Sequence, residues 1–125
     1  GGLPGTETSL QLMATYGVAT GRIDWSDIAR MLALNPAKIY NLWPRKGDLS
    51  PGADADLVLF DPAHEGVISA EDLHVVAGYS PYEGTRVKGR VVSTLRRGAF
   101  LVRDGELVAE PGTGVFVGRS ARSWS

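Results

Sequence analysis

Cysteine is absent from this sequence of 125 residues, and only two histidines are present. Without cysteine there is no disulfide, no zinc–thiolate site and no thiol nucleophile. Two histidines leave little material for a metal site. Long apolar runs are missing as well, since none approaches the ~20 residues that a helix needs to cross a membrane. These absences argue against a disulfide-stapled domain, a thiol-dependent enzyme and a membrane-spanning chain.

An excess of charge of either sign is also lacking, because 13 Lys and Arg stand against 14 Asp and Glu, a net charge of −1. This balance excludes a generally basic nucleic-acid-binding protein and an acidic disordered tail. Hydrophobic residues make up 43% of the chain, which is enough for the core of about one domain. The 16 glycines and 7 prolines predict many turns, and therefore short strands rather than a helical bundle.

Residues 1–44 are predicted to be mainly helical. The first helix has apolar residues at three- and four-residue spacing, which places them on one face. These residues are Leu10, Met13, Ala14 and Gly17. We expect Thr6 to cap this helix, Glu7 to favour its positive end and Gly17 to end it.

A second helix is predicted to begin at Asp24 or Ser26, either of which can serve as its N-cap. Its apolar stripe consists of Ile28, Met31, Leu32 and Leu34. Pro36 is expected to stop this helix, because the residue before a proline is pushed out of the α region. Asn35 is then expected to cap a short third helix with Pro36 at its first position.

Residues 48–119 are predicted to be mostly strands and turns. Apolar runs predict strands at 56–61, 67–68, 87–95, 98–102 and 107–108. The first of these runs is bounded by aspartates and is expected to be buried. Asp104-Gly105 lies between two apolar runs and is a strong signal for a hairpin turn.

Two sets of residues could carry chemistry, and each also has a structural interpretation. His64 and His74 could bind a metal, but two ligands from flexible loops rarely form a site, so we expect both to be solvated. Asp54, Asp56 and Asp61 could act as paired acid and base. In a turn that enters a strand, aspartates more often hydrogen-bond their own backbone, and we favour that role.

The second half of the chain also contains a basic stretch. It consists of Arg86, Lys88, Arg90, Arg96, Arg97 and Arg103. Alternation places the first three on one face of a strand. An anion- or nucleic-acid-binding surface is one interpretation, but a solvated face or subunit contact is favoured, because no aromatic platform is interleaved. Trp25, Trp43 and Trp124 are expected to be packing residues.

Several segments, taken in order, resemble a known family. They are GLPGTET (2–8), YGV (16–18), GRI (21–23), NPAKI (35–39), PRKG (44–47), GADADLVLFDP (52–62), PYEG (81–84), RRG (96–98) and GTG (112–114). The ordered set covers nearly the whole chain and resembles the C-terminal third of the cyclic amidohydrolases, which include hydantoinase (dihydropyrimidinase), allantoinase and dihydroorotase. Residues 38–47 are most like hydantoinase, whereas residues 80–84 and 92–95 are more like allantoinase or dihydroorotase.

This resemblance implies an α+β fold class, in which helices from the end of a (β/α)8 barrel precede the C-terminal part of a small β-sandwich. Residues 1–44 would be the helical segment, 45–119 the β-rich sandwich segment and 120–125 a flexible tail. The fold would be incomplete as a stand-alone unit. Unpaired strand edges and an apolar face would then favour dimerisation or the swapping of elements.

Enzymes of this family hold two metal ions with a His-x-His pair, a carboxylated Lys, two further His and an Asp, and a bridging hydroxide attacks the cyclic amide. None of these groups can be placed in this sequence. The resemblance therefore implies no catalytic residue, metal ligand or cofactor in this chain, and binuclear zinc or another divalent metal in a full-length parent. It also implies substrate contacts from the backbone of Gly1 and Gly2 in the intact enzyme, with Gly1 at a position where relatives usually have Asn.

The predicted function is that of the C-terminal part of a metal-dependent enzyme that hydrolyses a C–N bond of a cyclic amide or ureide, of the hydantoin, dihydropyrimidine, allantoin or dihydroorotate type. The isolated chain is expected to be inactive. The alternatives are a non-catalytic dihydropyrimidinase-like assembly module and one piece of a split enzyme. Expected partners are the rest of the parent enzyme or further copies of the chain, with a small cyclic amide as the parent's substrate. No nucleic acid and no membrane is expected, and the expected location is the cytoplasm.

Overall fold

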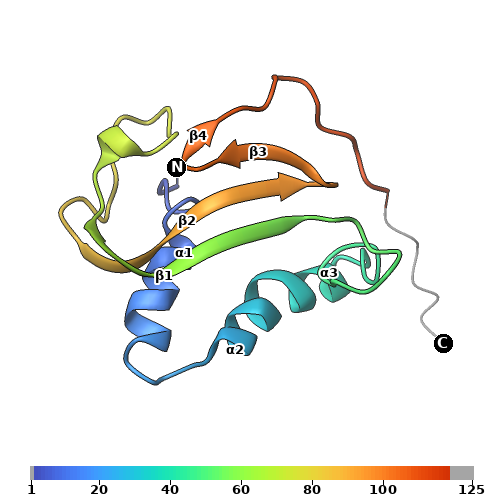
Figure 1. Cartoon of the computed structure of the whole chain (residues 1–125), viewed down its shortest axis with the longest axis horizontal. Helices are drawn as coiled ribbons and strands as arrows, with labels where there is room; N and C mark the ends of the chain where they lie inside the picture. The colour runs from blue at the N-terminus through green and yellow to red at the C-terminus, as the bar shows by residue number, and fades with distance from the viewer. Residues whose placement is uncertain (1, 119–125) are drawn as a thin grey trace. The chain divides into compact units, whose positions relative to one another are not determined.

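Three short helices precede a sheet of four strands along the chain (Figure 1). The computed structural model describes residues 2–118. Its elements are α1 (Ser9–Met13), η1 (Ala14–Val18), α2 (Trp25–Ala29), η2 (Arg30–Leu34), α3 (Asn35–Ile39), β1 (Leu57–Val67), η3 (Ala70–Asp72), β2 (Arg86–Arg96), β3 (Ala99–Arg103) and β4 (Glu106–Leu107). The predicted α+β class is confirmed.

The described residues pack as two compact units. The first unit contains residues 2–25 and 60–91, and the second contains residues 26–59 and 92–118. The division into a helical segment at 1–44 and a β-rich segment at 45–119 stays a prediction. The predicted tail at 120–125 lies outside the described residues.

The first predicted helix is confirmed, but its start differs from the prediction. It runs through α1 into a π-helical turn, η1. The residue before α1 is Thr8 rather than Thr6, and its hydroxyl donates to the carbonyl oxygen of Gly5 (3.1 Å) instead of capping a helical N–H. The second helix begins at Trp25, directly after Asp24, which is one of the two predicted N-cap positions.

Two predicted helix boundaries are wrong. Gly17 lies inside η1, and the helix ends one residue later at Val18. The second and third helices are continuous through α2, η2 and α3, so Pro36 does not separate them. Asn35 has helical φ and ψ of −65° and −46° and is not a cap. A proline normally clashes with the carbonyl four residues earlier, but η2 is a wider π-helical turn directly before it, and this change of spacing lets the helix continue.

The strands form one sheet in the order β1-β2-β3-β4 (Figure 1), and the pairs β2–β3 and β3–β4 are antiparallel. The predicted strands at 56–61 and 67–68 are one strand, β1, which continues through Pro62. A proline is tolerated there because β1 is an edge strand of the described sheet, and one side of an edge strand makes no ladder hydrogen bonds. The prediction of burial is wrong, since Val58 and Leu59 are about half exposed.

Two tight turns connect the last three strands. The central residues of the first are Arg97 and Gly98 (φ 50° and 80°), and those of the second are Asp104 and Gly105 (φ 51° and 87°). Positive φ at both central positions characterises a type I′ turn, whose twist suits a two-residue hairpin. The predicted hairpin turn at Asp104-Gly105 is confirmed, and Arg97-Gly98 forms a second turn of the same kind.

The first unit has a small core. Its buried apolar side chains are Ala14, Ile68 and Val87. Trp25 packs against Phe60, with ring centroids 5.3 Å apart, so the predicted packing role of Trp25 is confirmed. Gly89 lies beside the same ring, because a Cβ atom at this position would be 2.5 Å from Cζ of Phe60.

The second unit buries Ile28 and Ala37. Trp43 remains about half exposed, and the Lys38 ammonium lies 5.3 Å from its ring centroid. The third tryptophan, Trp124, lies outside the described residues.

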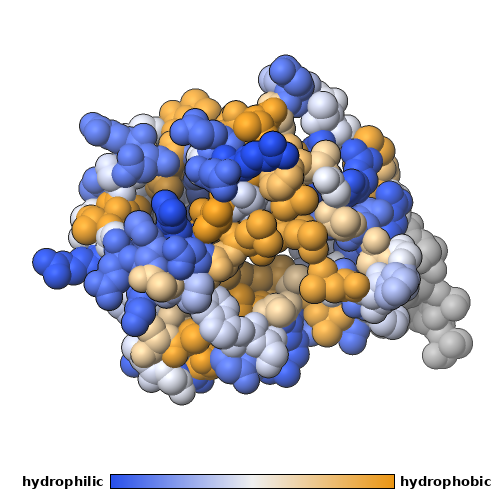
Figure 2. All heavy atoms as spheres, viewed as in Figure 1, coloured by the Kyte–Doolittle hydropathy of each residue, from blue (hydrophilic) through white to orange (hydrophobic). Residues whose placement is uncertain are grey.

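Large apolar side chains remain exposed in both units. They include Leu3, Tyr16, Val67 and Val76 in the first unit, and Met31, Leu32, Ile39, Leu49 and Phe116 in the second. Figure 2 shows apolar residues at the surface of the face in view. The predicted stripe of the second helix is therefore only partly covered. No helix within residues 2–118 is long and apolar enough to cross a membrane.

Candidate functional site

The segment Gly2–Gly5 precedes α1 and has no regular secondary structure. Gly2 and Leu3 are exposed, and a Cβ atom on Gly2 would meet no atom within 4 Å. The far end of the segment is held, because the hydroxyls of Thr8 and Ser9 both donate to the carbonyl oxygen of Gly5, at 3.1 and 2.7 Å. The segment therefore presents accessible backbone at Gly2 from a fixed base at Gly5. Gly1 lies outside the described residues.

Glu7 connects this segment to a loop more than sixty residues away. One of its carboxylate oxygens accepts from the backbone N–H of His74 (2.9 Å), and the other lies 2.8 Å from Nδ1 of the same residue. The predicted effect of Glu7 on the positive end of the helix stays a prediction. His74 is exposed, as expected, but it also hydrogen-bonds Glu7, which was not predicted. No local sequence pattern signals this pair, because the two residues are adjacent only in the fold.

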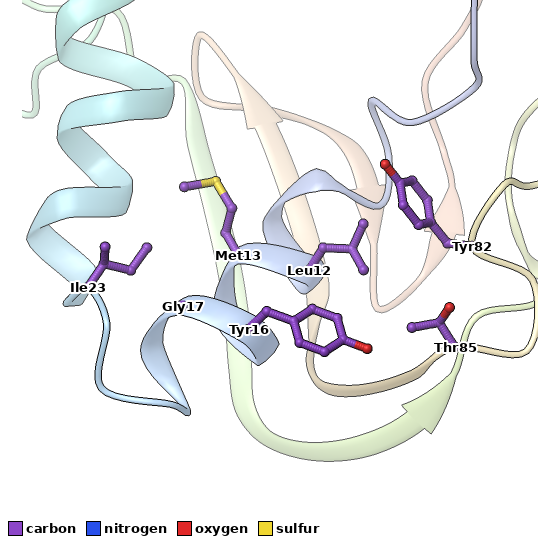
Figure 3. A pocket seen from close by; sticks show the side chains of 7 residues that line it. All are labelled: Leu12, Met13, Tyr16, Gly17, Ile23, Tyr82 and Thr85. Atoms are coloured by element: carbon purple, nitrogen blue, oxygen red, sulfur yellow. The ribbon is translucent and has the colours of Figure 1, made fainter.

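A pocket of about 500 Å³ lies beside α1 and η1 (Figure 3). It is lined by Leu12, Met13, Tyr16, Gly17, Ile23, Tyr82 and Thr85. Gly17 is required where the backbone passes Ile23, because a Cβ atom there would lie 2.6 Å from the Ile23 Cδ1. The Tyr82 ring also lies beside Gly5, 3.6 Å from where a Cβ would be placed. Tyr82 thus joins an apolar pocket to the base of the Gly2–Gly5 segment.

A second set of polar groups holds the turn before β1. The Lys46 ammonium lies 2.8 Å from Asp54 and also hydrogen-bonds Asp56, while Arg45 contacts Asp54 at 3.1 Å. The second oxygen of Asp56 accepts from the backbone N–H of Arg97 (2.9 Å). These carboxylates therefore bridge separate parts of the chain rather than bonding their own backbone as predicted.

The charges in this cluster stabilise one another. The hydrogen bond from Lys46 lowers the pKa of Asp54. Burial opposes ionisation of Asp56, but the hydrogen bonds from Lys46 and Arg97 outweigh it and lower its pKa. Burial also opposes the charge on Lys46, yet both aspartates together raise its pKa. The cluster is built to stay ionised, as a structural ion network does, and not to exchange protons as an acid–base pair.

The remaining candidates lie apart from Gly2–Gly5 in the sequence and have local contacts. Asp61 accepts from the N–H of Ala63 (3.0 Å), so the predicted bond to its own backbone is confirmed. His64 lies within β1 and not in a loop. The predicted alternation of the basic stretch is also confirmed, since Arg86, Lys88 and Arg90 are all exposed on β2.

The other basic residues contact their own unit. Arg96 donates to the hydroxyl of Thr113 (2.7 Å), and Arg97 to the carbonyl oxygen of the same residue (3.4 Å). The Arg103 guanidinium lies 4.1 Å from the ring centroid of Phe100.

The described residues do not provide the ligands that a binuclear metal centre needs. Within residues 2–118 no group of three or more His, Cys, Asp or Glu side chains could hold a metal ion. His74 is engaged with Glu7, and the paired aspartates at 54 and 56 are engaged with Lys46. Ligands for such a centre would have to come from elsewhere.

Residues 5–101 match the sequence model of the amidohydrolase family. The chain belongs to this family. Among curated relatives, it is 44% identical over 119 residues to the D-hydantoinase of Geobacillus stearothermophilus, and 42% identical over 118 residues to a D-phenylhydantoinase of Escherichia coli O1:K1. These alignments cover 95% and 94% of this chain, but only 25% and 26% of the two relatives.

Solved structures of hydantoinases match the fold of this amidohydrolase chain. The L-hydantoinase (dihydropyrimidinase) of Arthrobacter aurescens matches with a TM-score of 0.90 and 37% identity, over 94% of this chain and 26% of that one. A D-hydantoinase from a Thermus species matches with a TM-score of 0.86 and 40% identity, over 91% and 25%. The chain thus spans about a quarter of the length of these relatives.

Proposed function

We propose that this chain forms one part of a hydantoinase-type enzyme that hydrolyses a C–N bond of a cyclic amide or ureide. The observation that supports this proposal most strongly is the 44% identity to a D-hydantoinase over 119 residues. The relatives described above are hydantoinases, so we place hydantoins and dihydropyrimidines ahead of allantoin and dihydroorotate as substrates. In this proposal the chain includes helices from the end of a barrel and strands of a small sandwich.

The proposed contribution of this chain to the site is backbone recognition of substrate by Gly1 and Gly2. The accessible backbone of Gly2 and the anchored Gly5 carbonyl support it. Glycines suit this task, because the lack of a side chain allows close approach of a ligand to the backbone. The divalent metals expected for the reaction would be held by residues outside this chain, since the described side chains offer no ligand set.

A non-catalytic assembly module is the second candidate. It is favoured by the exposed apolar residues of both units, because large apolar patches mark surfaces that contact other protein. The two candidates differ in what they require of the partner. An enzyme needs metal ligands and a general base in the rest of the protein, whereas an assembly module does not.

The test is complementation of a truncated relative. The Geobacillus D-hydantoinase would be expressed without the quarter that matches this chain, and the chain of 125 residues would be added in increasing amounts. We expect hydantoin hydrolysis to appear and to saturate with added chain. The chain alone, assayed with the same metal, should show none. Binding of the two parts without hydrolysis would favour the assembly module instead.

A further inference from the structure

Two hydrogen bonds join Glu7 to His74. Both Glu7 oxygens are engaged, one by the backbone N–H of His74 and one by its ring at Nδ1. An ionised carboxylate can only accept hydrogen bonds, so Nδ1 must carry the proton and donate. This assigns the Nδ1–H tautomer to neutral His74. We call these two hydrogen bonds the clasp. Hydrogen bonds to a charged group are stronger than those between neutral groups.

The clasp acts on the segment Gly2–Gly5 through a short chain of contacts. Thr8 and Ser9 follow Glu7 directly, and both of their hydroxyls donate to the Gly5 carbonyl oxygen. Thr8 is fully buried, so this link does not compete with water. Fixing Glu7 therefore fixes the residues that hold Gly5. Gly2 and Leu3 then extend from an anchored point.

The loop that carries His74 is itself held at both ends. The carboxylate of Glu83 accepts from the N–H of Ala70 (2.7 Å), and the N–H of Gly84 donates to the carbonyl oxygen of Ile68 (2.9 Å). These bonds join the two ends of the loop that contains His74. His74 is thus presented from a supported loop, which allows it to position another segment.

We infer that Glu7 and His74 are positioning residues that hold the Gly2–Gly5 segment, and with it the substrate-facing backbone of Gly2, in place. This inference rests on the proposed function, in which that backbone contacts the cyclic amide. Neither side chain needs to touch the substrate. The expected consequence of breaking the clasp is a displaced binding backbone, which weakens substrate binding in the ground state and the transition state alike.

The clasp itself is tested first in the chain of 125 residues on its own. Amide hydrogen exchange and the 15N signals of the His74 ring would be compared between the wild type, Glu7→Gln and Glu71→Gln. Glu71 is a matched control, because it removes one carboxylate from the loop of His74 without an acceptor role for that carboxylate among the described residues. We expect Glu7→Gln to speed exchange of the His74 amide about tenfold, in line with the loss of a charge-assisted hydrogen bond. Exchange of the Ser9 amide, which donates to the carbonyl oxygen of Thr6, should rise as well. The ring should return to the commoner Nε2–H tautomer.

If Glu7→Gln fails to fold, His74→Ala gives a second measurement. It removes the ring contact but keeps the backbone N–H that Glu7 accepts, so exchange of the Ser9 amide should rise by a smaller factor than in Glu7→Gln. Unchanged exchange in both variants, or an Nε2–H tautomer in the wild type, would overturn the inference.

The positioning role is tested in the Geobacillus D-hydantoinase whose matched quarter is replaced by this chain. We expect Glu7→Gln to raise the KM for hydantoin about tenfold while kcat changes less than about twofold, and Glu71→Gln to change neither. An unchanged KM in Glu7→Gln overturns the positioning role. If the replacement enzyme with the wild-type segment is inactive while the exchange and tautomer results hold, the proposed function has failed and the clasp is a structural link only.

Discussion

Gly89 lies where β2 passes the aromatic ring of Phe60. Its φ is 90°, which side chains rarely adopt, and a Cβ atom would be 2.5 Å from the ring. We predict that Gly89→Ala destabilises the chain by about 2–4 kcal/mol, as the sum of backbone strain and overpacking. Denaturant unfolding measures this change in the free energy of unfolding.

Gly52→Ala is the matched control, because Gly52 has a φ of 98° and open space around its missing Cβ. This variant should lower the free energy of unfolding by the backbone strain alone, about 1–2 kcal/mol. In the Gly89→Ala background, Phe60→Leu should recover part of the loss. Equal effects of the two alanine variants would contradict the close approach of Gly89 to the ring.

Lys46 and its two aspartates predict how stability depends on pH. The pKa values of Asp54 and Asp56 are lowered by folding, so their contribution is present above the unfolded pKa, near 4, and is lost as the pH falls through the lower folded values. The pKa of Lys46 is raised, so its contribution is present below about 10.4 and is lost as the pH rises through the folded value.

We therefore predict that Lys46→Met flattens the fall in thermal stability at both acidic and strongly alkaline pH. Thermal unfolding followed by circular dichroism between pH 2 and pH 11 measures it. Lys88→Met is the control, because Lys88 is exposed on β2 and forms no ion pair among the described residues. A profile of Lys46→Met that parallels the wild type would show that the cluster does not govern the pH response.

At the scale of elements, the Thr15 side chain in η1 hydrogen-bonds a backbone N–H group of β2. In the register of β2 and β3 the first paired residue of β2 is Thr94, so the beginning of β2 extends past β3. There the Thr15 hydroxyl accepts from the backbone N–H of Lys88 (2.9 Å) and donates to the carbonyl oxygen of Gln11 (2.7 Å). An unpaired strand edge is a template for aggregation, and this contact closes part of it.

We predict that Thr15→Val lowers the free energy of unfolding by about 1 kcal/mol and speeds hydrogen exchange at the Lys88 amide. Thr20→Val is the control, because the Thr20 hydroxyl donates to the carbonyl oxygen of Tyr16 (2.7 Å) near its own helix and not to a strand. Thr15→Ser keeps the hydroxyl and should restore the exchange rate. Equal exchange at Lys88 in all three variants would argue against the contact.

The elements also show how far local sequence patterns reach. Helical periodicity and the Asp104-Gly105 turn were sufficient to place the first helix and the last hairpin, because both signals are local. The helix stop predicted at Pro36 is wrong, and the strands predicted at 56–61 and 67–68 are one strand through Pro62, because both outcomes depend on the surrounding fold. A π-helical turn before Pro36 and an edge position for β1 remove the usual penalty, and neither is visible without the fold.

At the scale of the whole molecule, the family was recognisable from ordered Gly-, Pro- and Asp-rich segments, while the clasp between Glu7 and His74 was not. The segments that identify the family are spread along the chain, and they can be recognised without knowing which residues are in contact. The clasp joins residues 67 apart in sequence. Likewise, Asp54 and Asp56 were correctly given a structural role, but their partner Lys46 follows from the fold of the turn before β1.

The exposed apolar residues predict self-association of the isolated chain. Large apolar side chains such as Val76 and Phe116 are almost fully exposed, and burying them against a second copy removes apolar area from water. Sedimentation velocity should give an average mass that rises above 13.3 kDa with concentration. A constant mass of 13.3 kDa up to high concentration would show that these faces need no cover.

The central claim is that this chain supplies one part of a hydantoinase-type enzyme. The most direct test is the rate of hydantoin hydrolysis by the Geobacillus D-hydantoinase in which the matched quarter is replaced covalently by this chain. The covalent form avoids any dependence on reassembly of two parts. We predict hydrolysis well above that of the truncated relative without the segment. A folded, metal-loaded replacement protein with no hydrolysis, beside an active unmodified relative, would contradict the claim.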